Sequence, residues 1–446
     1  MKQESPIAAI ATASGPAGVC VIRISGEGAF EVADRLVPHA GKPCRERHGG
    51  TFFHADFHHP LTHEKIDDGL VLVFHAPHSF TGEDVIEFQG HGGALPSRRL
   101  LDAVLAAGAR LAEAGEFSKR AFLNGRMDLT QAEAICDFIQ AKTERIAHVA
   151  RAQLDGALGS HINRLYDAMT AHCADIGHQL DFDEGELPDA FLRNTAEAIH
   201  ETHTQIQRMI ASWNTSGHLL REGELVVISG KPNVGKSSLL NAMLGHNRAI
   251  VHDAPGTTRD AIEERYSLEG IPLRLVDTAG LRDTADSVEQ EGIARAHRFM
   301  QQADINLYLI DSTTPDTPPH TLDPSRTIIV FTKKDLATRP DADGSVAVSS
   351  TTGEGLDALG KLILCKLGVD LEQDSTAIVN ARHANELRLA HDAASLALSA
   401  LATSPCDLVI AANHLRDAAE ALGRIVGRCY ADDLLDTIFS RFCVGK

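Results

Sequence analysis

The sequence is short of positive charge. It has 42 lysines and arginines against 61 aspartates and glutamates in 446 residues, a formal net charge of −19. Affinity for phosphate backbones comes mainly from lysine and arginine, so this balance excludes a standing basic surface for nucleic acid. A nucleic-acid role would need a local basic patch or a basic partner.

Long apolar runs and paired cysteines are also missing. The longest apolar stretches are strand-length pieces such as 225–228, far below the roughly 20 residues of a membrane span. Residues 1–6 have neither the apolar core of a signal peptide nor the arginine-rich bias of a transit peptide. The 8 cysteines form no Cys-x-x-Cys pair, and the 23 histidines are scattered without cysteine partners at zinc spacing. We therefore expect a cytoplasmic protein with reduced thiols, no membrane segment and no zinc or disulfide framework.

The patterning of the first half predicts an α+β segment followed by helices. At 43% hydrophobic residues the chain is an ordinary globular protein, and its length suggests about three domains. Within 1–120, the apolar runs 18–24 and 69–74 are bounded by glycine and proline, as strands are. Thr130-Gln-Ala-Glu133 has the spacing of a capping box. It opens a helical region whose apolar stripe, in steps of three or four, is Leu154, Leu158, Ile162, Leu165, Met169, Cys173, Ile176 and Leu180.

The second half alternates strand and helix before it turns helical again. Short apolar runs at 225–229, 273–276, 305–310, 327–331 and 346–349 are separated by helix-length intervals, which predicts a doubly wound, mostly parallel sheet. Helical periodicity returns near Asn380, with a stripe from Leu408 to Ile425, and Asp432-Asp433 is a candidate cap for a last helix. We predict an α/β domain inserted into a helical one, with boundaries at 1–120, 121–220, 221–378 and 379–446.

Residues 230–237, Gly-Lys-Pro-Asn-Val-Gly-Lys-Ser, form a complete GxxxxGK[ST] phosphate loop between a predicted strand and a predicted helix. In such a loop the glycines let backbone N–H groups surround a phosphate, while Lys236 reaches the terminal phosphates and Ser237 can ligate Mg²⁺. The sequence therefore predicts a nucleoside triphosphate site.

Three further motifs follow in the order that a Ras-like GTPase requires. Gly256-Thr-Thr-Arg-Asp260 is placed to supply a switch threonine, and Asp277-Thr-Ala-Gly280 ends a predicted strand where a carboxylate can hold Mg²⁺. Thr332-Lys-Lys-Asp335 follows another strand, where Asp335 can accept from guanine and the stem of Lys333 can lie along the base. We therefore expect specificity for GTP.

The motifs depart from the Ras-like pattern at three places. Thr332 stands where asparagine is usual, and Ser349-Ser-Thr351 stands where a Ser-Ala-Lys base loop is expected. Leu281 replaces the glutamine that orients the attacking water. Glu289, in a loop rich in aspartate and threonine, is either the group that orients the water instead or a solvated glutamate at a helix start.

Taken together, these stretches resemble the tRNA modification GTPase MnmE (TrmE) family. The resemblance extends to Ser79-Phe-Thr-Gly-Glu-Asp84, Gly90-His-Gly-Gly93, Gly115-Glu-Phe117, Arg120-Ala-Phe-Leu-Asn124 and the terminal Phe442-Cys-Val-Gly-Lys446. It covers nearly the whole chain. It implies an α+β folate-binding and dimerisation domain, an α-helical domain and an inserted Ras-like α/β GTPase domain.

The resemblance also implies a function. A homodimer would work with an FAD-dependent partner protein to install a carboxymethylaminomethyl-type group on carbon 5 of the wobble uridine of tRNA, with 5-formyl- or methylene-tetrahydrofolate as one-carbon donor. GTP hydrolysis would depend on K⁺, and most tRNA contact would come through the partner. By resemblance Glu289 orients the attacking water, Ser237 and Thr258 bind Mg²⁺, and the K⁺ positions are Asn233, His252, Ala254 and Thr257.

The remaining site assignments follow from the same motifs. The folate positions are Arg23, Glu87, Arg126 and Lys446, and Cys443 is either a thiol used in modification or a structural one. The GTP-binding residues are Asn233, Val234, Gly235, Lys236, Ser237, Ser238, His252, Asp253, Ala254, Pro255, Gly256, Thr257, Thr258, Asp277, Thr278, Ala279, Gly280, Lys333, Asp335, Ser349 and Ser350.

Two other classes of function compete with this interpretation. A non-catalytic GTP switch in ribosome assembly would need a basic RNA-binding module, and the segment after residue 380 is amphipathic helix of mixed charge. A free-standing folate-dependent transferase would leave the intact GTPase motifs without a role. We therefore predict a K⁺-activated GTPase of tRNA modification.

Overall fold

The structure, a computed structural model, describes residues 5–13, 15–141, 143–182, 189–213, 223–246, 263–277, 299–337, 344–368, 380–403 and 406–445. The chain forms two compact units, Met1–Cys136 with Gly423–Lys446, and Asp137–Leu422. Over the described ranges, no helix is both long enough and apolar enough to span a bilayer.

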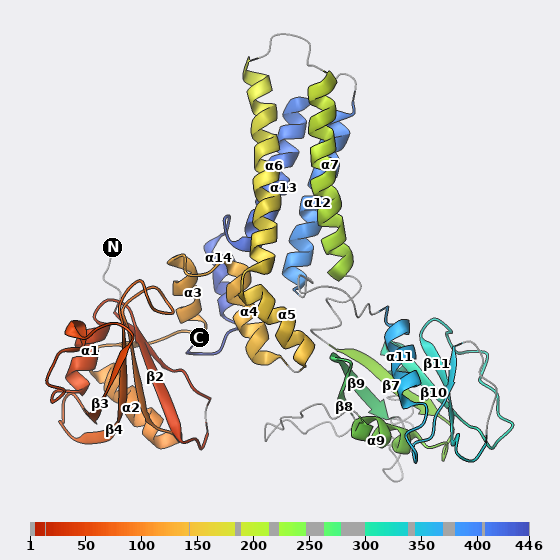
Figure 1. The fold of residues 1–446 in the computed structure, drawn as a ribbon, viewed down its shortest axis with the longest axis horizontal. Helices are drawn as coiled ribbons and strands as arrows, with labels where there is room; N and C mark the ends of the chain where they lie inside the picture. Colours follow the sequence, from red (N-terminus) through yellow and green to blue (C-terminus); the bar gives the residue numbers. More distant parts are fainter. Residues whose placement is uncertain are drawn as a thin grey trace. The chain divides into compact units, whose positions relative to one another are not determined.

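The first unit is built on a six-stranded sheet (Figure 1). Its strands are β1 (Ile7–Ile10), β2 (Val19–Ser25), β3 (Thr51–His58), β4 (Lys65–Phe74), β5 (Val85–His91) and β6 (Arg110–Leu111), in the order β3-β4-β5-β2-β1-β6. Only β1 and β6 pair in parallel among these neighbours. The strands predicted at 18–24 and 69–74 are confirmed as β2 and β4.

Side chains alternate between the two faces of this sheet. Ile22 and Ile24 of β2 and Ile86 and Phe88 of β5 point into one core, which also holds α1 (Ala29–Leu36) and α2 (Ala94–Ala106). Because successive strand residues face opposite sides, Arg23 and Ser25 of β2 belong to the other face. That face carries a second cluster in which Phe117 of α3 (Glu116–Leu123) packs on Ile7 and Ala9.

The C-terminal end of the chain belongs to this first unit. Leu435, Ile438 and Phe439 of α14 (Asp432–Phe439) pack on Leu129 and Ala132 of α4 (Leu129–Gln140). The last described residues then run beside α3 and β1, where Ala114 bridges to Val444.

The helix starts that the sequence predicted here need correction. α4 begins at Leu129, so Thr130 lies inside the helix. The capping box is formed by Asp128 and Gln131: Asp128 Oδ1 accepts from the Gln131 N–H at 2.9 Å, and Gln131 Oε1 accepts from the Asp128 N–H at 3.0 Å. The N-cap of α14 is Ala431, so the Asp432-Asp433 pair lies in the first turn.

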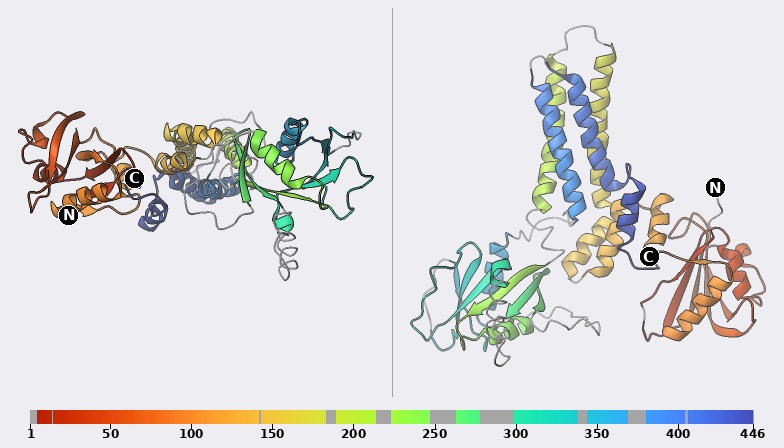
Figure 2. Two further views of the ribbon diagram at one scale, coloured as in Figure 1. Left: turned by 90° about the horizontal axis from the view of Figure 1, so that it is seen from below. Right: turned by 180° about the vertical axis from the view of Figure 1, so that it is seen from behind.

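The second unit contains a group of helices outside its sheet: α5 (Glu144–Leu154), α6 (Ala157–Phe182), α7 (Asp189–Ser212), α12 (Ala381–Leu401) and α13 (Leu408–Val426). Figure 1 and the right view of Figure 2 show the last four lying side by side. The stripe predicted on α13 is buried, and Asn380 caps α12 through its side chain. The stripe predicted from Leu154 to Leu180 was wrong at both ends. The chain turns at Gly156 with φ +89°, so Leu154 ends α5, and Leu180 is exposed.

A second six-stranded sheet carries the α/β fold. Its strands are β7 (Glu224–Gly230), β8 (Glu263–Leu268), β9 (Ile271–Asp277), β10 (Ile305–Asp311), β11 (Thr327–Thr332) and β12 (Ser345–Ala347), in the order β12-β11-β10-β7-β9-β8. All pairs are parallel except β8 with β9. Each predicted strand is confirmed, whereas β8 was missed because, of its five residues with a described burial, Tyr266 and Leu268 alone are buried.

Helices α9 (Lys236–His246) and α11 (Leu356–Lys366) contribute to the core of this sheet. Val149 of α5 is buried in the same core, although α5 precedes the sheet in sequence by a long helical segment. Hydrophobic contact therefore fixes α5 to the α/β fold within this unit.

Candidate functional site

The phosphate loop lies between the end of β7 and the start of α9. Gly230 has φ +141°, and a Cβ placed there would be only 2.6 Å from the carbonyl oxygen of Leu309 on β10. Asn233 also has a positive φ, of 63°. These backbone conformations curl the loop over the N-terminus of α9, where helix N–H groups and the helix dipole favour an anion.

Lys236 is held inside this loop. Its ammonium donates to the carbonyl oxygens of Gly230 at 3.2 Å and Lys231 at 2.8 Å, and the residue is 7% exposed. These carbonyls belong to the loop itself, so they place the ammonium where the loop would hold a phosphate.

The hydroxyl of Ser237 and the carboxylate of Asp277 meet beside the loop. Ser237 Oγ donates to Asp277 Oδ2 at 2.6 Å, and Asp277 is the last residue of β9. Mg²⁺ prefers oxygen ligands, so this pair has the donor chemistry that the ion requires. The structure thus brings together Lys236, Ser237 and Asp277, as the motifs predicted.

The base-recognition motif is tied to the phosphate loop by the residue that departs from the Ras-like pattern. Thr332 is 2% exposed, and its hydroxyl donates to the carbonyl oxygen of Val234 at 2.7 Å. Its Oγ1 also lies 3.3 Å from the carbonyl oxygen of Ile310. The hydroxyl of Thr332 is therefore hydrogen-bonded to backbone carbonyls, so this side chain holds the phosphate loop in place and does not project toward a base.

The other residues of this motif lie at the surface. Lys333 Nζ pairs with Asp311 Oδ2 at 2.6 Å. That hydrogen bond lowers the pKa of Asp311 to about 2, because it outweighs the effect of burial and is helped by Thr313. Asp335 is exposed, as a guanine-binding carboxylate must be before the base arrives. The N–H of Lys334 bonds the carbonyl of Val348 at 3.1 Å, which brings the Ser349-Ser350 loop beside the motif.

Several predicted residues lie outside the described part of the chain. They are the switch and K⁺ positions, the residues after Asp277, the candidate for orienting water and the last folate position: His252, Asp253, Ala254, Pro255, Gly256, Thr257, Thr258, Thr278, Ala279, Gly280, Glu289 and Lys446. Asn233 is the K⁺ position that the structure does describe.

A second candidate site lies in the first unit. It is a cavity of about 340 Å³ lined by Arg23, Phe74, His78, Ser79, Phe80, Val85, Glu87 and Arg126. Three of the four predicted folate positions therefore line one cavity. Mixed apolar and polar walls with a few convergent charged groups are typical of small-molecule sites.

The register of the sheet creates the charged centre of this cavity. Arg23 of β2 and Glu87 of β5 are direct partners across the antiparallel pair. Arg23 Nε donates to Glu87 Oε1 at 2.8 Å, with side-chain exposures of 17% and 14%. The guanidinium also lies over the rings of Phe80 and Phe117, at 5.3 and 5.8 Å from their centroids.

The two arginines of the cavity differ in whether a carboxylate already pairs with them. Arg23 is paired with Glu87, whereas the exposed Arg126 has no ion pair with any other described residue. Arg126 is thus the cation available to an anionic end of a ligand, and Glu87 offers a carboxylate to a group that donates two N–H bonds. A folate, with an amidine-like pterin edge and a carboxylate tail, fits this donor set.

Cys443 lies on the terminal segment, which runs beside β1. It is exposed, and its carbonyl accepts from the Gly115 N–H at 3.5 Å. The next glycine, Gly445, has φ +98°, and a Cβ there would be 2.3 Å from the carbonyl oxygen of Ile10. The glycine of the terminal Cys-x-Gly-Lys is therefore required by its close approach to β1.

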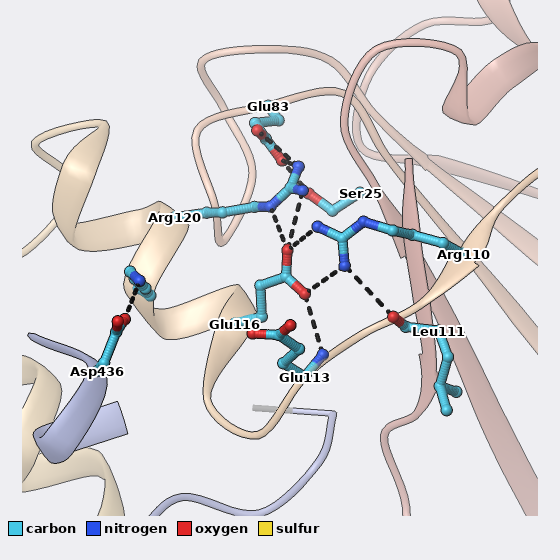
Figure 3. Close-up of polar contacts among 9 residues, drawn as sticks. Ser25, Glu83, Arg110, Leu111, Glu113, Glu116, Arg120 and Asp436 are labelled. Carbon is cyan, nitrogen blue, oxygen red and sulfur yellow. Dashed lines mark hydrogen bonds and ion pairs between the residues drawn. The ribbon is translucent and has the colours of Figure 1, made fainter. Parts of the chain in front are cut away.

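The sequence analysis missed a polar network beside the cavity, shown in Figure 3. Glu116 and Arg120 on α3 connect Arg110 at one end to Glu83 and Ser25 at the other. The spacing of Glu116 and Arg120, one helical turn apart, was the available signal. The contact between Arg120 and Glu83 joins residues 37 positions apart, so no local sequence pattern could predict it.

Comparisons with known proteins cover the whole chain. The family described as "MnmE helical domain" matches residues 129–443, and "GTP-binding protein TrmE N-terminus" matches residues 6–126. The chain is 40% identical over 465 residues to the "tRNA modification GTPase MnmE" of Geotalea uraniireducens, covering 100% of both chains. It is 42% identical over 461 residues to the protein of that name from Symbiobacterium thermophilum, covering 99% and 100%. The crystal structure of an Aquifex aeolicus Era variant bound to GDP·AlF4− is 26% identical, covering 39% of this chain and 67% of that one, with a TM-score of 0.26.

Proposed function

Because the chain belongs to the family of tRNA modification GTPases known as MnmE, we propose that its GTP hydrolysis serves modification of carbon 5 of the wobble uridine in tRNA. It acts in the cytoplasm as a homodimer, together with an FAD-dependent partner, to add a carboxymethylaminomethyl-type group. The observation that carries the proposal is the presence, in one chain of this family, of a phosphate loop with Lys236 buried in it and a cavity centred on Arg23 and Glu87.

At the GTP site, the chain's own residues position the phosphates and the attacking water. Lys236, whose ammonium bonds carbonyls of the loop, neutralises charge that develops on the terminal phosphate. Ser237 and Thr258 would bind Mg²⁺ directly and Asp277 would hold it through water, while Asn233, His252, Ala254 and Thr257 would bind K⁺. These ions supply positive charge beside the phosphates. Glu289 orients the water in place of the glutamine that Leu281 replaces.

In the cavity, Glu87 accepts from the amidine-like edge of a reduced folate, and Arg126 faces its carboxylates. Arg23 and Lys446 are the other cations that the resemblance assigns to the carboxylates. Bound 5-formyl- or methylene-tetrahydrofolate supplies the one-carbon unit. Phe80 and Phe74 give the pterin ring an apolar surface. The net charge of −19 supports a division of labour in which most contact with tRNA comes through the partner.

Nucleoside analysis of tRNA tests the proposed substrate. Cells that lack the protein should accumulate wobble uridines without the aminomethyl-type group, and the parent gene should restore it. Lys236→Ala and Glu87→Gln should each fail to restore it, because each removes a charged group from one of the two sites. Unchanged wobble uridines in cells without the protein would overturn the proposed function and leave the GTPase activity standing.

GTP turnover in K⁺ and in Na⁺ tests the hydrolytic mechanism. We expect faster turnover in K⁺, and a loss of about 10²-fold or more in Glu289→Ala, because the attacking water loses its positioning group. Glu291→Ala is the matched control, a carboxylate two residues away that should retain parental turnover. Equal rates in the two salts would refute K⁺ activation, and a fully active Glu289→Ala would refute the role of Glu289.

A further inference from the structure

The loop that walls the cavity is anchored from behind by the network of Figure 3. We infer that Glu83 and Arg120 are positioning residues for ligand binding: their ion pair holds loop 79–84 so that Phe80 and Arg126 frame the cavity. The inference rests on the proposed binding of a reduced folate, and it assigns a role to residues that do not line the cavity themselves.

Glu83 is the point where the loop is attached to the sheet. Its Oε2 accepts from the hydroxyl of Ser25, on the last residue of β2, at 2.7 Å. Ser25 Oγ also lies 2.6 Å from Thr81 Oγ1, and both residues are fully buried. The carbonyl of Glu83 accepts from Ser79 Oγ at 2.6 Å, which fixes a residue of the cavity wall directly.

Arg120 links this attachment to helix α3. Its Nη1 donates to both carboxylate oxygens of Glu83, at 3.1 and 3.2 Å, and its Nη2 donates to Glu116 Oε1 at 3.1 Å. Arg120 and Glu116 are each 11% exposed. The planar guanidinium therefore bridges two carboxylates through separate nitrogens, which arginine can do and lysine cannot.

Glu116 is in turn held in its charged form by its neighbours. Burial alone would raise the pKa of Glu116, but hydrogen bonds from Arg110, the Glu113 N–H and Arg120 outweigh it and lower the pKa. The Arg110 Nη1 to Glu116 Oε2 distance is 2.8 Å. Two acidic and two basic side chains thus form a chain of alternating charge from β6 to the loop.

The position of the loop also sets the position of Arg126. Asn124, just after α3, donates through Nδ2 to the carbonyl of Thr81 at 2.8 Å. Gly82 has φ +78°, and a Cβ there would meet Arg126 Cγ at 3.1 Å and Asn124 Cβ at 3.2 Å. A displaced loop would therefore carry Phe80 away from Arg23 and leave Arg126 without its packing surface.

The experiment measures the affinity of the full-length protein for 5-formyltetrahydrofolate by calorimetry. The variants are Arg120→Gln, Glu83→Gln, the double variant and Arg120→Lys. Lys119→Gln is the matched control, because Lys119 lies next to Arg120 on α3 but pairs with Asp436 on α14, away from the loop. The thermal midpoint of each variant reports whether the first unit is folded, and the Kd for GTP, whose site lies in the other unit, reports whether that unit is intact.

We expect Arg120→Gln and Glu83→Gln each to raise the Kd for 5-formyltetrahydrofolate by about tenfold or more. The double variant should be no weaker than the worse single variant, because the two residues act as one unit. Arg120→Lys should recover part of the affinity, and Lys119→Gln should bind like the parent. GTP affinity should be unchanged throughout.

Two results would overturn the inference in distinguishable ways. If the parent binds the folate and the glutamine variants bind it equally well while retaining GTP affinity, the network does not position the cavity, and the proposed function stands. If the parent itself does not bind 5-formyltetrahydrofolate, the proposed folate site falls and the inference falls with it. A merely structural role would lower the thermal midpoint of the variants without changing their Kd for the folate.

Discussion

The phosphate loop draws its functional groups from consecutive residues, whereas the cavity draws them from separate stretches of chain. Gly230 to Ser237 supply the turn, the ammonium and the hydroxyl of the nucleotide site. The cavity needs β2 for Arg23, β5 for Glu87 and the segment after α3 for Arg126. A binding site made by one local turn survives most changes elsewhere, while one made by strand register depends on every element that fixes the register.

The two sites also differ in what holds their charges. Lys236 is held by backbone carbonyls, which no substitution removes. Arg23 is held by the carboxylate of Glu87, and Arg120 by those of Glu83 and Glu116. Substitutions that impair nucleotide binding should therefore be concentrated at a few positions, whereas substitutions that impair the cavity should be spread over the network that supports it.

The largest effect is expected at Lys236. Lys236→Ala should lower GTP turnover by about 10²-fold or more, because the charge facing the terminal phosphate is lost. Steady-state phosphate release measures it. The control is Lys231→Ala in the same loop, whose exposed ammonium pairs with Asp316 and whose loss should leave turnover close to parental. Parental turnover in Lys236→Ala would contradict the assignment.

The cavity should be next most sensitive, at Glu87. Glu87→Gln keeps the shape but removes the charge, so that Arg23 loses its ion pair and the ligand loses its charged, two-oxygen acceptor. We expect the Kd for 5-formyltetrahydrofolate to rise by about 10- to 100-fold. Glu64→Gln, which breaks an exposed pair with Arg99 in the same unit, should bind like the parent. An unchanged Kd in Glu87→Gln would show that this carboxylate takes no part in ligand binding.

A smaller effect is expected at Thr332, which tests how far the nucleotide site depends on a distant side chain. Thr332→Val removes the donor to the Val234 carbonyl while conserving shape, so the loop loses one brace. GTP affinity should fall by about three- to tenfold in a fluorescent-nucleotide titration. Thr327→Val, at the other end of the same strand, is the control. If Thr332→Val binds GTP as tightly as Thr327→Val and the parent do, the hydrogen bond from Thr332 on β11 does not stabilise the phosphate loop.

The smallest effect is expected from the ion pair of Asp311 and Lys333. Since the pKa of Asp311 is lowered to about 2, its contribution to stability is present above its unfolded pKa, about 3.9, and is lost as the pH falls toward 2. Asp311→Asn should therefore flatten the fall of the thermal midpoint between about pH 4 and pH 2, by a few degrees at most, since Lys333 is 39% exposed. Identical pH profiles for the variant and parent would show that the pair contributes nothing.

Local patterns predicted most of the elements but not their ends. Strand-length apolar runs located β7, β9, β10, β11 and β12, and the stripe on α13 proved to be its buried face. The capping box at Thr130 was wrong because Asp128 occupies the same kind of pattern two residues earlier. The break at Gly156 was missed because an isolated glycine is tolerated within a helical pattern.

Site residues were predictable in proportion to how local their geometry is. Lys236, Ser237 and Asp277 came from motifs, and the structure brings them together. Arg23 and Glu87 came from resemblance alone. Alternation with Ile22 and Ile24 placed Arg23 on one face of a strand, but nothing in the sequence identified the opposing strand. The brace from Thr332 to Val234 spans 98 positions and had no local signal.

The sequence by itself determined what depends on neighbours in the chain: a phosphate loop between a strand and a helix, alternating strands, helical stripes and an excess of acid. Backbone geometry repeats over a few residues, so these features leave periodic traces. Only the tertiary structure decided that Arg23 faces Glu87, that Arg120 reaches Glu83 and that Gly445 closes against Ile10. Those contacts depend on strand register and on how α3 and the C-terminal segment pack against the sheet, which are properties of the whole first unit.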